Sequence, residues 1–541
     1  MNLAISRVRR LITCWIPRAI GVIVLVLGLA WAVESLRVNP VWMATQTAIH
    51  ARGEPLTFAE LLGPSPASQK NFAESPLVVG LHTYLRTNDA KGRRRHLWLG
   101  GQKLEESKEA FSFPNASTPK GSKTEKRPLR NGVDLDGLAA VLRAGTNTRS
   151  KQVTDPVSGT VTQITTLYNL PKPNSLLSSA QAVLFALQAR RDVLDRLVVD
   201  TQLPVCRYAI RYDDAILALL PHLSLHKTMA QLLRIRAIAR INAGESNGAN
   251  EDVLALFRLA DLTGSEPTLI SYLVSVAIHS IGLGAFHEGI SLHVWTESQL
   301  AVFQQVFDSQ RQRDGLVGAL RGERLFGGLL SESVIAGDLD IFEAGLSGDS
   351  SSGSFSPLTL FPAFFWRQNQ LAHAITLDRI TALVQQSNPS RGLLAQDTNE
   401  AIDRLIKERL SGFALYQVFN KMLLPALGKV SSRSDRMLTA DRLAVTVCAL
   451  ERYRLAMGTY PESLVALTPR WMNSVPLDPM DGQPLRYQLQ SGGDLRLYSV
   501  GANKSDDGGI GDSATGRKST EQELLDWVWP LAGAADERRL F

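Results

Sequence analysis

The strongest apolar signal in the chain lies near the amino terminus, where no charged residue occurs from Ala19 to Val33. A helix formed by this run alone covers about 22 Å of a hydrocarbon core that is about 30 Å thick. A helix that begins at Leu11 is long enough to span the core. We therefore predict a transmembrane anchor over residues 11–33. A cleaved signal peptide is the alternative, because Ala30-Trp31-Ala32 has the small residues of a cleavage site.

The next part of the chain, residues 34–170, alternates short apolar stretches with Pro and Gly and predicts a mixed α/β region. Within it, residues 102–131 combine Lys, Glu, Ser, Pro and Gly without periodicity, which indicates a basic linker. Thr160–Leu167 is rich in β-branched residues and predicts a strand.

Residues 175–425 have apolar positions at helical spacing. The pattern predicts successive antiparallel helices that pack as a large bundle or an irregular α-solenoid. The segment Pro267–Phe286 contains no Asp, Glu, Lys or Arg and is long enough for a second membrane span. Its serines and its charged neighbouring helices favour a helix buried inside the helical domain instead.

The last part of the chain, residues 433–530, changes pattern again. A helix is predicted from Ser434 to Met457, and Gly458 is placed to end it. Two short alternating segments then predict strands, Leu485–Leu489 and Leu495–Val500. The predicted fold class is therefore mainly α, with a small α+β module at the carboxyl end.

Composition and charge narrow the class of protein. With 44% hydrophobic and 20% charged residues, the chain is folded rather than disordered. The net charge of +6 does not call for a nucleic-acid partner. Arginines instead gather ahead of the apolar run, which predicts a cytoplasmic amino end and an extracytoplasmic bulk. Cys206 and Cys448 then lie in the exported part, either paired or, as we favour, as buried free thiols.

Catalytic motifs are missing from the sequence: it contains no GxGxxG, GxxxxGK[ST], GxSxG or CxxC. His222 and His226 are four residues apart without the HExxH glutamate, and His287 and His293 have the wrong spacing for a zinc protease. We therefore predict a non-enzymatic protein, and the sequence identifies no small-molecule substrate. The alternative is an exported hydrolase whose site in the helical domain is assembled from dispersed groups such as Glu323, Asp252 and the histidines.

Three ordered motifs mark the carboxyl-terminal module: YRLAMGTYPESLVAL, then VPLDPMDGQPLRY, then LYSVGANKSDDGG. Residues 434–529, which contain them, resemble the periplasmic domain of the major (G-type) pseudopilins of type II secretion systems. In that family an acidic loop after the last strand binds calcium. The resemblance implies a Ca²⁺ site here, with oxygen ligands from Asn503, Asp506, Asp507 and Asp512.

The chain also departs from that family. It lacks the Gly-Phe-Thr-Leu-Ile-Glu start of a pseudopilin, and its predicted membrane segment lies far upstream of the module. The whole chain instead resembles large bacterial membrane-anchored proteins that carry such a module at the carboxyl end. We expect a single-pass protein of the bacterial inner membrane with a periplasmic bulk, protein partners, and a role linked to secretion or envelope assembly.

Overall fold

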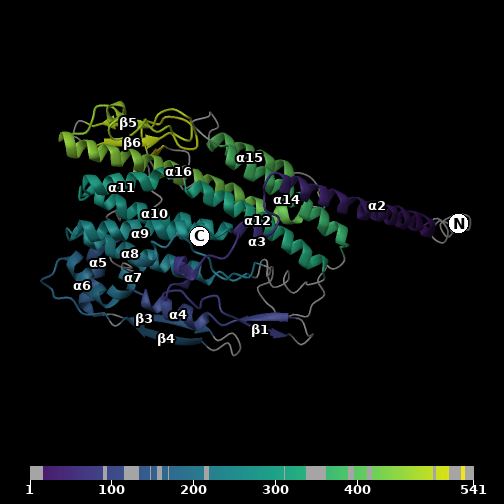
Figure 1. Ribbon diagram of the computed structural model, residues 1–541, viewed down its shortest axis with the longest axis horizontal. Helices are drawn as coiled ribbons and strands as arrows, with labels where there is room; N and C mark the ends of the chain where they lie inside the picture. Colours follow the sequence, from purple (N-terminus) through teal and green to yellow (C-terminus); the bar gives the residue numbers. More distant parts are fainter. Residues whose placement is uncertain are drawn as a thin grey trace, which may run out of the picture.

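The protein is mainly helical, with small antiparallel sheets, in a computed structural model (Figure 1). This confirms the mainly α fold class. The structure describes the following residues: 16–88, 94–114, 133–145, 148–154, 161–168, 170–212, 218–309, 311–336, 361–387, 395–410, 417–490, 495–510 and 526–529.

Helix α2, Ile16–Ala51, contains the described part of the predicted anchor and continues well beyond it. Figure 1 shows its amino-terminal part extending away from the body, whereas its later part lies against α14. Pro40 lies inside the helix, which nevertheless continues to Ala51. The described part of the predicted anchor and the first part of the body therefore form one helix with no linker between them.

The mixed amino-terminal region contains two β-hairpins, which are formed by β1 with β2 and by β3 with β4. The predicted strand at 160–167 is confirmed as β4. The predicted linker at 102–131 is wrong in its first part, because α4 occupies Gly101–Ala110 and buries Leu104. The bounds are α3 Phe58–Leu62, η2 Ser68–Lys70, η3 Phe72–Glu74, β1 Tyr84–Asn88, β2 Arg94–Trp98, α5 Leu135–Ala144, β3 Thr148–Thr154 and β4 Val161–Leu167.

The helical body is organised around α10, Leu269–Ser291, which contacts α8, α9, α12 and α16. Within the described residues α10 is the helix whose length and hydropathy suit a membrane crossing, yet 78% of its apolar window is buried. It is the buried helix that the sequence predicts. The other bounds are α6 Ser179–Leu187, η5 Gln188–Arg190, α7 Arg191–Asp200, α8 Pro221–Asn242, α9 Ser246–Gly264, α11 Glu297–Asp308 and α12 Arg311–Ile335.

Three further helices complete the body: α14 Ala363–Gln386, α15 Ala395–Leu410 and α16 Val418–Met457. The predicted boundary between residues 425 and 433 falls inside α16, whose 40 residues form one helix about 60 Å long. Its carboxyl-terminal half packs in the same hydrophobic core as α8–α10 and β6. Cys206 and Cys448 are both free and buried, which confirms the unpaired interpretation.

The carboxyl-terminal module packs on the end of α16. After η9, Leu464–Leu467, two predicted strands are confirmed as β5, Arg486–Leu489, and β6, Leu495–Ser499. A third strand, β7, Trp527–Val528, pairs antiparallel with β6 and makes the sheet order β5-β6-β7. Figure 1 places this sheet and the projecting end of α2 at opposite ends of the molecule.

Candidate functional site

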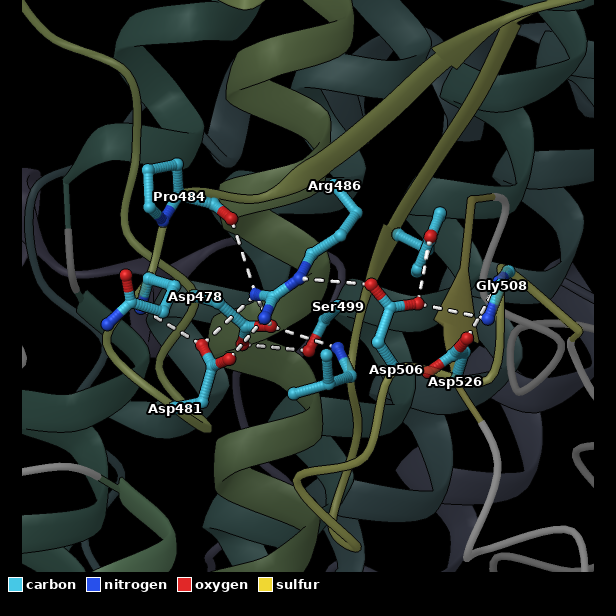
Figure 2. A network of polar contacts seen from close by, with 12 residues as sticks. Asp478, Asp481, Pro484, Arg486, Ser499, Asp506, Gly508 and Asp526 are labelled. Atoms are coloured by element: carbon cyan, nitrogen blue, oxygen red, sulfur yellow. Dashed lines mark hydrogen bonds and ion pairs between the residues drawn. The ribbon is translucent and has the colours of Figure 1, made fainter.

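A network of carboxylates joins the turns and strands of the module (Figure 2). Asp478 is fully buried at its centre. Its carboxylate accepts hydrogen bonds from Ser499 Oγ at 2.8 Å and from the backbone N–H groups of Met480 and Val500, both at 3.0 Å. Burial raises the pKa of Asp478, and these donors partly oppose the rise. Asp478 therefore ties the turn that precedes β5 to the end of β6.

Arg486, at the start of β5, is the cation of this network. Its guanidinium pairs with Asp481, lies 3.5 Å from Asp478 Oδ2, and places Nε 3.8 Å from Asp506 Oδ2. The hydrogen bond with Asp481 raises the pKa of Arg486. Asp506 also accepts a hydrogen bond from Tyr498 Oη at 3.0 Å. Asp506 therefore faces the sheet, and its negative charge is partly balanced by Arg486 of the same module.

Two other predicted calcium ligands, Asn503 and Asp507, contact each other. Asn503 Nδ2 donates to Asp507 Oδ2 at 3.0 Å, and Asn503 Oδ1 accepts from the backbone N–H of Ser505 at 3.1 Å. Asp512 lies outside the described residues. The structure therefore brings Asn503 and Asp507 together, and it places Asp506 on a different set of partners.

Asp526, just before β7, is a carboxylate of this loop that the sequence did not single out. It is 2% exposed, and its Oδ2 accepts from the backbone N–H of Gly509 at 2.7 Å, whereas its Oδ1 is buried without a hydrogen-bond partner. Burial raises its pKa, with a smaller contribution from the charges of Asp507 and Asp506, whereas the nearby backbone N–H groups of Gly509 and Asp507 partly oppose the rise.

This orphaned carboxylate oxygen beside two other acids suits a cation. The described residues nevertheless contain no group of three or more His, Cys, Asp or Glu side chains arranged for a metal. In the sequence, Asp526 could have been noticed as a candidate ligand only because it directly precedes the apolar residues that form β7.

A second polar cluster lies in the helical body, where the sequence suggested only isolated histidines. His222 Nε2 lies 2.7 Å from Glu266 Oε2, and His222 Nδ1 lies 3.0 Å from His82 Nε2. His226, one turn along α8, lies 2.8 Å from both Tyr208 Oη and Thr263 Oγ1. The cluster joins the segment before β1 to α8 and to the α9–α10 connection. His82, which completes it, comes from a part of the chain that no local motif links to α8.

Burial lowers the pKa of His82 to about 3, with a further contribution from the charge of His222. Burial also lowers the pKa of His226. Below pH 6.5 an unfolded chain binds protons at both positions and the folded chain does not, so stability falls as the pH falls.

We expect His82 to make the protein progressively less stable as the pH falls from about 6.5 toward about 3, by at most about 1.4 kcal/mol per pH unit. Thermal unfolding of the His82→Gln variant in mild detergent should show a flatter pH dependence than the natural protein. His50→Gln is the matched control, because it makes the same substitution at a histidine that is 64% exposed and lies outside the cluster. An unchanged slope in His82→Gln would contradict the expectation.

Within the described residues, the carboxylates of the acids proposed for a hydrolase bind structural partners other than His222 and His226. Asp252 pairs with Arg236 and Arg240, and Glu323 accepts a hydrogen bond from the backbone N–H of Leu269 at 3.1 Å. A cavity of about 20 Å³ beside α16 and one of about 240 Å³ in the module are lined by other residues. The hydrolase hypothesis therefore rests on the sequence alone.

Comparison with known proteins adds no relative: no protein-family model, no curated protein and no solved structure matches the chain.

Proposed function

We propose that the protein is a non-enzymatic, membrane-anchored cell-envelope protein, single-pass in the bacterial inner membrane, with its bulk in the periplasm. The observation that carries this proposal is the exposure of α2. Apolar side chains at seven-residue intervals form a stripe along it: Val22, Leu29, Leu36 and Met43, which are 60%, 59%, 78% and 67% exposed. In water such a stripe is unfavourable, and in a bilayer its amino-terminal half is solvated by lipid.

The attachment of α2 to the body supports an anchor over a cleaved signal peptide. Residues 30–32 lie in the middle of a continuous helix. Just after them, Glu34 Oε2 accepts a hydrogen bond from Gln368 Nε2 at 3.0 Å. Beyond the end of α2, Glu54 binds Arg321 of α12 through both carboxylate oxygens, at 2.9 and 2.6 Å. Cleavage at residues 30–32 would cut α2 in two, just ahead of the part that is fixed to the body.

Charge substitutions on α2 test the anchor. Replacing both Val22 and Leu29 by Arg should shift the chain from a carbonate-resistant membrane fraction to the soluble fraction, because charges near the bilayer centre are costly. Replacing Leu36 and Met43 by Arg is the matched control: it has the same spacing on the same stripe, but lies past the apolar run. Equal membrane retention of both double variants would contradict the proposal.

The carboxyl-terminal module is proposed to be the part that contacts other proteins. Its resemblance to the pseudopilin domain supports a role in secretion or envelope assembly. Its place on α16 supports the same role, because this helix of about 60 Å holds the sheet at the end of the molecule opposite α2 (Figure 1). The network of Asp478 and Arg486 fixes the turns of the module against its strands (Figure 2).

We also propose that Ca²⁺ binds the acidic loop of the module, with Asp507, Asp526 and Asn503 as its described ligands. The ion would supply the positive charge that the orphaned Oδ1 of Asp526 lacks. At a hundred times its Kd, Ca²⁺ stabilises a folded protein by about 2.7 kcal/mol.

The full chain in mild detergent should therefore melt at a higher temperature in Ca²⁺ than in chelator. Asp526→Asn should reduce this difference, and Glu462→Gln, at an exposed acid of the same module, should preserve it. Equal melting temperatures of the natural protein in both conditions would rule out the calcium site.

A further inference from the structure

The end of the body from which α2 projects carries an aromatic cluster with one exposed ring. Phe361, just ahead of α14, is 41% exposed, and its ring stacks on that of Phe365 with centroids 4.4 Å apart. Phe365 and Trp366 are buried against Leu330 and Val334 near the end of α12. This aromatic cap, Phe361 to Trp366, is therefore fixed to the core on one side while Phe361 stays open on the other.

Contacts between α2 and α14 locate this cap along the membrane helix. Glu34 on α2 forms a hydrogen bond with Gln368 on α14. Farther toward the carboxyl end of each helix, Arg52, just past α2, pairs with Asp378 of α14 at 2.6 Å. The two helices therefore run side by side in the same direction. Ala363, the first residue of α14, precedes Gln368 by five residues, which is about 7.5 Å along a helix, and Phe361 lies just ahead of it. The cap therefore lies level with the apolar run of α2 that ends at Val33.

Polar groups follow the aromatic residues in α14 and lie between them and the rest of the body. Arg367 at the first turns of α14 pairs with Glu332 near the end of α12. Helix α16 begins at the same level, where the backbone N–H of Val418 donates to Asn369 Oδ1 at 2.7 Å. Three helix ends therefore meet here: the exposed ring of Phe361 lies on the outside, and the buried rings and the ion-paired or amide side chains lie toward the body. In membrane proteins aromatic side chains, above all Trp and Tyr, gather at the level of the headgroups.

We propose that this aromatic cap lies in the interfacial region of the bilayer that α2 spans and contacts lipid directly. The proposal rests on the membrane anchoring proposed above. Lipid is the occupant that the geometry favours, because the cap is level with a helix segment whose own apolar side chains are exposed, Val22 at 60% and Leu29 at 59%. A body held by both α2 and the cap has a fixed depth and tilt on the membrane.

Spin labelling of the full chain in proteoliposomes of zwitterionic and anionic lipid tests this contact. A Cys14→Ser background removes the thiol ahead of the apolar run. Cys206 and Cys448 are buried, and burial raises the pKa of both thiols, so they should stay unlabelled. Nitroxides are then placed on Phe361→Cys and, as a second position in the cap, on Ala363→Cys.

Two reference positions calibrate the readout, which is collision with oxygen against collision with a water-soluble nickel complex. Leu29→Cys reports the bilayer, and Val465→Cys, at a module residue that is 70% exposed, reports water. We expect oxygen and nickel access at 361 and 363 to lie between the values at 29 and at 465, because an interfacial position lies between hydrocarbon and water. Nickel access like that at 465, or exclusion of both reagents by a protein partner, would overturn the cap proposal. Nickel access at 29 itself would overturn the anchor as well.

Discussion

Replacing Asp252 by Ala is expected to destabilise the protein by about 3–5 kcal/mol, the usual cost of breaking a buried ion pair. Asp252 on α9 is fully buried and binds Arg236 at 2.6 Å and Arg240 at 2.9 Å, both on α8. Arg236 is itself only 4% exposed. The substitution would leave the Arg236 guanidinium buried. Its remaining acidic partner would be the partly exposed Asp195, which lies 2.6 Å away.

Asp195→Ala is the matched control for this result, because it removes a partner of the same arginine. The Asp195 side chain is 47% exposed, so water can replace it and the loss should stay at or below about 1 kcal/mol. Chemical denaturation in mild detergent, followed by circular dichroism, measures both variants. Similar losses for the two would show that burial of the α8–α9 ion pair is not what stabilises it.

Replacing Gly322 by Ala is expected to cost about 3 kcal/mol, because α12 approaches the α9–α10 connection too closely for a side chain. A Cβ built on Gly322 lies 1.7 Å from the backbone oxygen of Pro267. Backbone cannot rotate away as a side chain can, so α12 has to move. That movement would also strain the hydrogen bond between the carboxylate of Glu323 and the backbone N–H of Leu269, now 3.1 Å.

Gly318→Ala, one turn earlier in α12, provides the control. A Cβ at Gly318 has nothing within 4 Å, and alanine stabilises a helix interior by up to about 1 kcal/mol relative to glycine. Thermal unfolding should therefore move in opposite directions for the two alanine variants. A loss in both, or in neither, would show that the approach of α12 to Pro267 does not limit stability.

The sequence predicts helices best where the apolar spacing is continuous and capping residues are present. Residues 267–286 were predicted as a buried helix, and α10 is that helix, with Thr268 as its N-cap. The prediction of helix ends was weaker. The apolar spacing continues without interruption from residue 297 to residue 320, yet these residues belong to α11 and α12, because the end of α11 at Ser309 has no glycine or proline to mark it. α4 was missed because its single buried leucine, Leu104, is too little to show periodicity.

Candidate sites were harder to predict than helices, since they depend on groups far apart in sequence. Asn503, Asp506 and Asp507 were found together because a glycine-rich loop and a family resemblance pointed to them. Asp526 was not found, because its place beside that loop is created by the pairing of β7 with β6. His82 was missed for the same reason: it lies 140 residues from His222, its hydrogen-bonding partner.

The central claim is that α2 anchors the protein in the inner membrane with its body outside the cytoplasm. Its most direct test is the labelling of Val465→Cys, at an exposed position of the module, in the Cys14→Ser background in a bacterial host. A membrane-impermeant maleimide is added after the outer membrane is opened and again after the inner membrane is lysed. We predict that the chain stays in the membrane fraction and is fully labelled before lysis. Labelling only after lysis, or a labelled chain that is fully soluble, would contradict the claim.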